Sequence, residues 1–157
     1  MSTTYFVAPL MCRFCGVVSP ANSTTVMTSR LLDDPRNIVL HLGDEVTKDR
    51  ADIIDSFISL RDLPTAGPLV VLEEWYCASC GSRRFAHVIF DENNRIASIE
   101  TVELTRIAFD AAHLTYEGIA ELYEVLVGEP FYVDGIVRAD FPERVRAHLP
   151  AGPPGIF

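Results

Sequence analysis

Residues 69–90 have the sequence LVVLEEWYCASCGSRRFAHVIF, which decides the fold of this 157-residue chain. Aliphatic and aromatic residues fill two runs, 69–76 and 84–90, and such residues favour β-strands. A short segment of small residues that ends in a glycine separates the two runs, as in an antiparallel hairpin. The sequence therefore predicts two paired strands with Cys77–Gly81 at the turn between them.

The same pattern continues after the hairpin. Residues 91–94 (DENN) predict a second turn, and residues 96–104 predict a third strand that returns along the sheet. Helices are predicted over 116–127 and over 140–149. We therefore expect an α+β fold with a mainly antiparallel sheet and one or two C-terminal helices.

Periodicity and end signals define the two helices. The apolar residues of the first share one helical face. They are Ile119, Leu122, Tyr123 and Leu126. Thr115 can cap this helix, and Gly128 followed by Pro130 ends it. Asp140 and Glu143 resemble a capping box at the start of the second helix.

The first 68 residues give weaker local signals. The expected elements are an extended segment Thr3–Leu10, a strand over 26–32, a short buried strand over 37–42 ended by Gly43 and Asp44, a helix over 48–60 with Thr47 as a possible N-cap, and a loop over 63–68 that marks an internal boundary. Residues 48–60 also suit a strand, because Ile and Phe favour strands.

Four cysteines form two pairs of the same design, CRFCG at 12–16 and CASCG at 77–81. Two residues between the members of a pair allow both sulfurs to reach one ion at about 2.3 Å. The residue after the second cysteine often needs a positive φ, which glycine adopts without strain, so Gly16 and Gly81 complete the turns. Together the pairs predict one closed, tetrahedral structural zinc site. Its ligands are Cys12, Cys15, Cys77 and Cys80.

These two five-residue knuckles and their flanking strands resemble those of zinc-ribbon and rubredoxin-like proteins. The 61 residues between Cys15 and Cys77 make the connection much longer than in a compact ribbon. The resemblance implies either a ribbon with a long insertion over 17–76 or an α+β domain cross-linked by a ribbon-style site. We expect one zinc-linked domain over 1–149 and a tail over 150–157. Iron of the rubredoxin type and a thiol–disulfide centre are the alternatives to zinc.

Composition limits the class of protein. Apolar residues make up 48% of the chain, and no run reaches about 18 apolar residues, so we expect a globular protein without a membrane span. The N-terminus lacks the pattern of a secretory signal, which favours a cytoplasmic location and reduced thiols. The net charge is -9, which opposes nonspecific binding to nucleic acid.

A closed four-cysteine shell leaves no position for a substrate, and the sequence contains no catalytic motif that we recognise, so we expect no enzyme activity. The first functional hypothesis is an acidic binding protein, either an adaptor or an inhibitor of the immunity type, whose protein partner can be basic. The second is a zinc ribbon that binds nucleic acid through Arg13, Phe14, Arg83 and Arg84. A rubredoxin-like or thiol redox protein is the third. The histidines are expected to have local structural roles, and the oligomeric state stays open.

Overall fold

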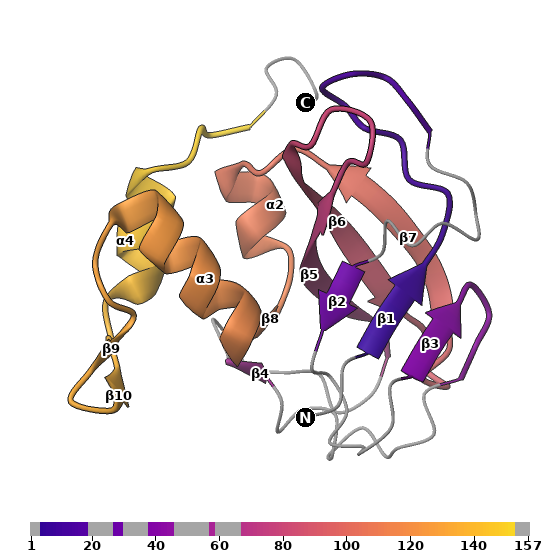
Figure 1. Cartoon of the computed structure of the whole chain (residues 1–157). Helices are drawn as coiled ribbons and strands as arrows, with labels where there is room; N and C mark the ends of the chain where they lie inside the picture. The colour runs from indigo at the N-terminus through magenta and orange to yellow at the C-terminus, as the bar shows by residue number, and fades with distance from the viewer. Residues whose placement is uncertain (1–3, 19–26, 30–37, 46–56, 59–66, 153–157) are drawn as a thin grey trace.

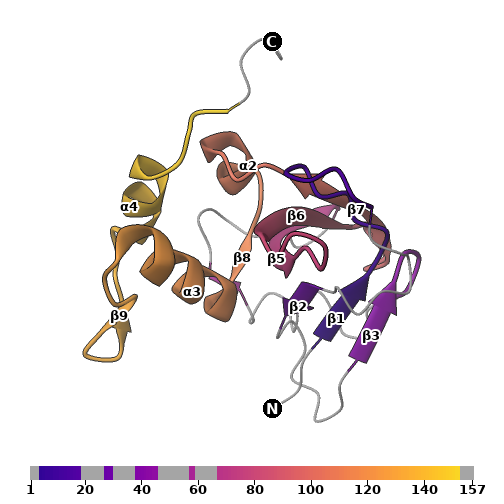
Figure 2. The same cartoon turned by 45° about the horizontal axis from the view of Figure 1, so that its top comes forward.

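The computed structural model describes residues 4–18, 27–29, 38–45, 57–58 and 67–152. Its elements, in chain order, are β1 (Thr4–Val7), β2 (Met27–Ser29), β3 (Ile38–His41), β4 (Phe57–Ile58), β5 (Leu69–Tyr76), β6 (Arg83–Phe90), β7 (Ile96–Val102), α2 (Arg106–Asp110), β8 (Leu114–Thr115), α3 (Tyr116–Val127), β9 (Tyr132–Val133), β10 (Ile136–Val137) and α4 (Phe141–Ala147). They form three layers, with a small sheet on one side of a central sheet and the helices on the other (Figures 1 and 2). Among the residues described, no helix has both the length and the apolar character needed to cross a bilayer.

The central layer is the antiparallel sheet β5-β6-β7. This order confirms the predicted hairpin and the third strand, which ends at Val102 rather than at residue 104. The turn between β6 and β7 is held by the Asp91 carboxylate, whose Oδ1 accepts hydrogen bonds from the amides of Asn93 (2.8 Å) and Arg95 (3.0 Å). Asn94 completes the turn with φ of +58°.

Strand β5 is buried on both faces, which explains its nearly continuous apolar sequence. Val71 and Trp75 face the core shared with the small sheet, whereas Leu72 faces the core shared with the helices. The alternation of side chains along a strand therefore divides the interior into two cores. The first core reaches the cysteine knuckles through Cys12 and Cys77.

The small sheet has the order β2-β1-β3. Strand β1 pairs antiparallel with β2 and parallel with β3, a pairing that no local signal indicates. In β3 Leu40 is buried in the first core, but Val39 is half exposed because its side chain points to the opposite face of the small sheet, so the predicted burial of this strand holds on one face only. After β3, the Gly43 amide donates to the Ile96 carbonyl (2.8 Å) and joins the two sheets at one corner.

Helix α3 begins and ends where the sequence predicts. The Gly128 amide donates to the Glu124 carbonyl (3.1 Å), and its φ of +79° ends the helix. Leu122 and Tyr123 are buried in the second core, as the periodicity predicts. Helix α2 was not predicted; it has five residues, and Thr105 Oγ1 caps it by accepting from the Ala108 amide (3.1 Å).

Helix α4 confirms the second predicted helix but not its capping box. Asp140 occupies the N-cap position without a side-chain cap hydrogen bond. Its carboxylate instead accepts from Arg144 Nε (2.7 Å), because an arginine one turn later competes for it. The helix ends at Ala147, two residues before the predicted Leu149.

The predicted helix over 48–60 falls outside the described residues except at 57–58, where the prediction is wrong. Those two residues form β4, which pairs with β8. Pairing with a strand distant in sequence therefore outweighs the helical spacing of the apolar residues. The remainder of the predicted strand over 26–32, Thr47, residues 63–66 of the predicted loop and residues 153–157 of the tail also lie outside the described residues. The division into a domain over 1–149 and a tail stays a prediction, although Pro150 accepts a backbone hydrogen bond from Arg106 (2.8 Å).

Candidate metal centre

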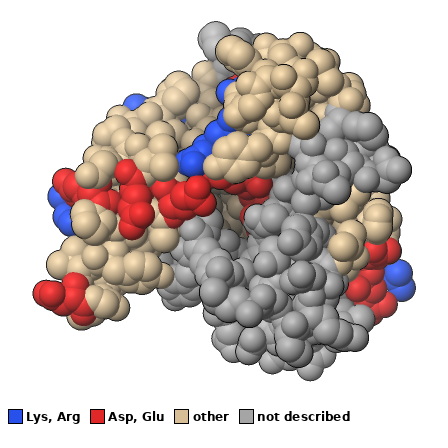
Figure 3. Space-filling view, viewed as in Figure 1, with Lys and Arg blue, Asp and Glu red and all other residues tan. Residues whose placement is uncertain are grey.

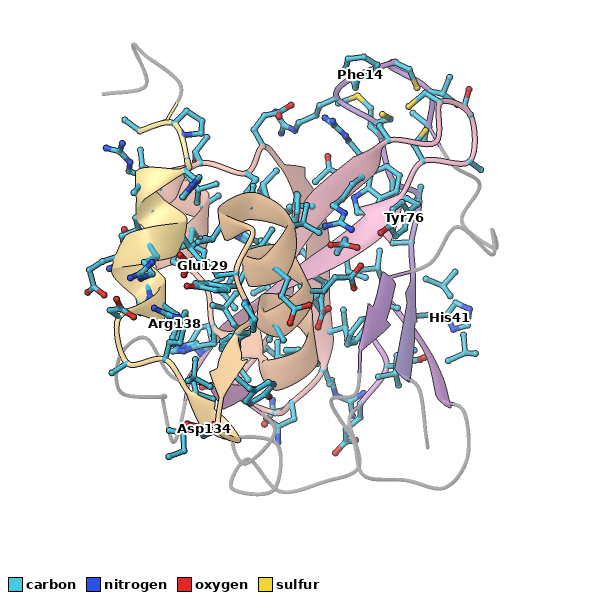
Figure 4. All side chains as sticks on the ribbon, turned by 60° about the vertical axis from the view of Figure 1, so that its left-hand side comes forward. Phe14, His41, Tyr76, Glu129, Asp134 and Arg138 are labelled. Atoms are coloured by element: carbon cyan, nitrogen blue, oxygen red, sulfur yellow. The ribbon has the colours of Figure 1, made fainter. Side chains whose placement is uncertain are left out.

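The fold brings the two cysteine pairs together at the end of the central hairpin. The four sulfur atoms lie within 4.8 Å of one another. Cys12 Sγ is 3.7 Å from Cys80 Sγ, and Cys15 Sγ is 3.7 Å from Cys77 Sγ. Metal–sulfur bonds of about 2.3 Å in a tetrahedron place the sulfurs about 3.8 Å apart, whereas a disulfide bond is about 2.05 Å long. The four cysteines therefore have a metal-binding geometry, and Figure 4 shows their sulfur atoms beside Phe14.

The two knuckles have the same backbone hydrogen bonds. In each, the glycine amide donates to the carbonyl of the first cysteine, at 2.7 Å for both Gly16 and Gly81. The amide of the first cysteine donates in turn to the carbonyl five residues later, at Val17 (2.9 Å) and Ser82 (3.0 Å). Both glycines have positive φ, +79° and +70°, which confirms the reason given for their presence.

Burial distinguishes the members of each pair. Cys12 and Cys77 are buried at the end of the first core, whereas Cys15 and Cys80 are exposed. The cluster therefore lies at the boundary between core and solvent. A metal ion at this position would join two segments that are far apart in the sequence and cover the end of the core.

Nearby donors favour the thiolate form of two cysteines. Burial raises the pKa of Cys12, but the amides of Cys15 and Phe14 more than offset this and lower it to about 6. The Ser82 hydroxyl, 2.9 Å from Cys80 Sγ, lowers the pKa of Cys80. Hydrogen bonds to the sulfur are what a metal–thiolate site requires around its ligands.

Cys15 shows the opposing effect. The amide of Val17 lowers its pKa, but partial loss of water around the sulfur of this exposed residue and the other three sulfurs together raise it to about 11. The physical cause is repulsion among negative charges placed within 5 Å of one another. A divalent cation between the sulfurs would reverse this effect, so the cluster fits a metal ion better than four free thiols.

The arginines and the aromatic residue predicted near the knuckles separate into two groups. The guanidinium group of Arg84 lies over the Phe14 ring, 5.4 Å from its centre. Arg13 is exposed and donates from Nε to the Thr101 carbonyl (3.1 Å), beside the same knuckle. Arg83 instead contacts two carboxylates, Glu74 (3.4 Å) and Glu121 (3.1 Å).

Three histidines, His87, His113 and His148, make local contacts, as expected. His87 Nε2 lies 2.9 Å from the Ala108 carbonyl and links β6 to α2. His148, at the end of α4, places Nδ1 2.8 Å from the Arg144 carbonyl. His113 is buried, and its backbone joins β8 to β5. The cysteine cluster found among the described residues contains no histidine.

Ser82 is a functional residue that the cysteine spacing did not predict. It stands five residues after the first cysteine of its knuckle, at the place that Val17 takes in the other knuckle. The hydroxyl contacts Cys80 Sγ at 2.9 Å and lies 3.9 Å from Cys12 Sγ. A polar residue two positions after a ligating cysteine could have indicated this role, since hydroxyls often donate to thiolates.

Comparison with known proteins gives no match: no family model, no curated protein and no solved structure matches the chain. The metal site is therefore argued from cysteine spacing, knuckle geometry and sulfur distances alone. Zinc and iron both bind four thiolates in this arrangement.

Proposed function

We propose that this protein is a non-enzymatic zinc protein that binds a protein partner, as an adaptor or an inhibitor of the immunity type. The observation that carries the proposal is the four-cysteine cluster, with two sulfurs in the core and two at the surface. Four protein ligands complete the shell of a structural zinc ion and leave no position for a reactant. The zinc ion then contributes to function by stabilising the folded structure that binds the partner.

An acidic surface supports the choice of a protein partner. Glu121 and Glu124 are exposed on α3, and Glu121 also pairs with Arg83 (3.1 Å). Figure 3 shows acidic side chains following one another across the side of the molecule on which α3 lies. With a net charge of -9, this surface would attract a basic protein and repel acidic ones.

The metal is tested first. Purified protein should contain one zinc ion per chain by elemental analysis, and Cys77→Ser should lose it. A red protein that contains iron would support the rubredoxin-type alternative instead. A protein without metal, whose cysteines form disulfides, would support a thiol redox centre and contradict the proposal.

The partner surface is tested by charge reversal. Native affinity capture should recover a partner with the wild-type protein and lose it with Glu121→Lys/Glu124→Lys. The matched control is Glu92→Lys/Glu100→Lys, which changes the net charge equally at other exposed positions. Equal loss with both double variants would indicate a nonspecific charge effect and contradict an acidic interface on α3.

Binding of single-stranded nucleic acid is the second candidate. Phe14 is 73% exposed, and Arg13 and Arg84 lie beside it, a combination that can stack a base and contact a phosphate. Arg83 contributes less than the sequence suggested, because Glu74 and Glu121 neutralise it. Fluorescence anisotropy with oligo(dT) at low salt tests this candidate, because electrostatic affinity is highest there.

A further inference from the structure

The two knuckles have the same backbone hydrogen bonds but differ in their exposed side chains. The first knuckle and its flanks expose large apolar side chains. They are Met11 (45% exposed), Phe14 (73%), Val17 (45%) and Val18 (56%). The corresponding positions of the second knuckle are Tyr76 (49% exposed), Ser79, Ser82 and Arg83. Four large apolar residues are therefore exposed at the first knuckle and one at the second.

The turn itself does not require these apolar residues. Small and polar residues at the second knuckle form the same hydrogen bonds, with the same glycine-to-cysteine distance of 2.7 Å. Soluble proteins seldom expose several large apolar residues together unless the patch binds something. The difference between the knuckles thus indicates a use for the first one beyond metal binding.

The charge around the first knuckle is opposite to that of the whole protein. The first 32 residues of the sequence contain Arg13 and Arg30 and no Asp or Glu, although the chain carries a net charge of -9. Arg13 is exposed, and the Arg84 guanidinium lies over the Phe14 ring at 5.4 Å. Because Arg84 is paired with Glu103 (3.9 Å), the positive charge beside the apolar patch is that of Arg13.

We infer that the first knuckle is a docking surface for a protein segment that carries apolar side chains flanked by Asp or Glu. Apolar side chains would cover Phe14 and Val18, and a carboxylate would pair with Arg13. This surface is separate from the acidic face of α3. It depends on the metal-held knuckle of the proposed function but not on the acidic interface.

The charges favour a protein segment over nucleic acid. A nucleic-acid strand presents a phosphate at every nucleotide and needs several free cations along its path. Here Arg84 lies 3.9 Å from the carboxylate of Glu103, and Arg83 is held by Glu74 and Glu121. Of these three arginines of the described residues, Arg13 is left to contact an anion, which suits a segment with one or two carboxylates.

The experiment is a selection from a display library of random short peptides against the zinc-loaded protein. Peptides are counter-selected against Phe14→Ser and resynthesised for anisotropy measurements. We expect enrichment of peptides that combine aliphatic or aromatic residues with Asp or Glu. Their affinity should fall at least about tenfold in Phe14→Ser, as for a residue that anchors an interface. Arg13→Gln should weaken binding less and reduce its salt dependence.

The controls separate this inference from the proposed function. Zinc content must be unchanged in Phe14→Ser, and Ser79→Ala on the second knuckle should bind the peptides normally. Glu121→Lys/Glu124→Lys should also bind them normally, so failure of the acidic interface would not affect the result. Selection of Lys- or Arg-rich peptides, absence of any Phe14-dependent peptide, or tighter binding of oligo(dT) would each overturn the inference.

Discussion

The two cysteine knuckles have the same turn but very different structural support. The second knuckle ends a hairpin in which all eight residues of β5 pair with the eight residues of β6. Trp75 is buried beneath it and donates from Nε1 to the Phe85 carbonyl (3.3 Å). The first knuckle follows the four-residue strand β1 and is closed by a single bridge between Met11 and Val18.

This difference indicates that an ion bound to the four cysteines would fix the first knuckle onto the second, rather than the reverse. The hairpin can form its knuckle by local pairing, because its strands are adjacent in sequence. The first knuckle depends on long-range contacts, so a metal ion would attach it, and the small sheet behind it, to a hairpin that is already folded. Because such a site does not exist in the unfolded chain, metal binding adds to folding free energy, by about 10 kcal/mol under favourable conditions.

Metal removal should have the largest effect on stability. It tests directly whether the hairpin folds without the metal while the first knuckle does not. With a chelator, or in Cys77→Ser, we expect a loss of several kcal/mol of unfolding free energy. Hydrogen exchange should show residues 8–18 losing protection while 69–76 and 83–90 keep theirs. Ser79→Ala, a change at the same turn, should retain both metal and stability. Equal loss of protection in both knuckles would contradict the comparison.

Replacing Ser82 should have a smaller effect than removing the metal, and it tests a side chain that the first knuckle lacks. Ser82→Val removes the hydroxyl 2.9 Å from Cys80 Sγ and installs the residue found at the same place in the first knuckle. We expect zinc affinity to fall about tenfold, as for loss of a hydrogen bond to a metal ligand. Competition with a chromogenic chelator measures the change. An unchanged affinity would show that the hydroxyl does not stabilise the thiolate.

Replacing either knuckle glycine by alanine should cost about 1 kcal/mol and shows how each knuckle depends on the metal. Alanine at Gly16 or Gly81 would meet no atom within 4 Å, so its cost is the positive φ alone. Gly81→Ala should destabilise the metal-free protein, because its hairpin is already formed. Gly16→Ala should leave the metal-free protein unchanged and weaken metal binding. Asparagine, which tolerates positive φ better, should recover part of the loss at either position.

A charge pair remote from both knuckles gives the smallest effect. The hydrogen bond and charge of Arg144 hold the pKa of Asp140 below its usual value, so the pair stabilises the fold above the ordinary pKa of aspartate. This contribution is lost as the pH falls through the lowered pKa. Asp140→Asn should therefore melt slightly lower than wild type at neutral pH, with the difference vanishing in acid. Asparagine keeps the N-cap preference and isolates the charge.

Sequence patterns predicted the elements whose signals are local. The strands of the hairpin, the turn at Asp91 and the face of α3 that carries Leu122 all follow from neighbours within a few positions. The cluster of four cysteines followed from chemistry, because two pairs with the same spacing, each followed by a glycine, have few other uses. These are the features that a short window of sequence contains.

The rest depends on partners that sequence spacing does not reveal. The parallel pairing of β1 with β3 joins segments more than 30 residues apart, and β4 exists because β8 lies beside it. Helix α2 is too short for a periodic pattern, and Thr105 is its main signal. The exposure of Val39 follows from its place on the outer face of the small sheet, which the apolar run over 37–42 did not indicate.

The separation of the two pairs also has a consequence during synthesis of the protein. Cys80 follows Cys12 by 68 residues, so a ribosome adding about 5 to 20 residues per second completes the second pair roughly 3 to 14 seconds after the first begins. During that interval the nascent chain offers only two of the four sulfurs. The emergence of the hairpin therefore sets the time at which the N-terminal strands can take their final place.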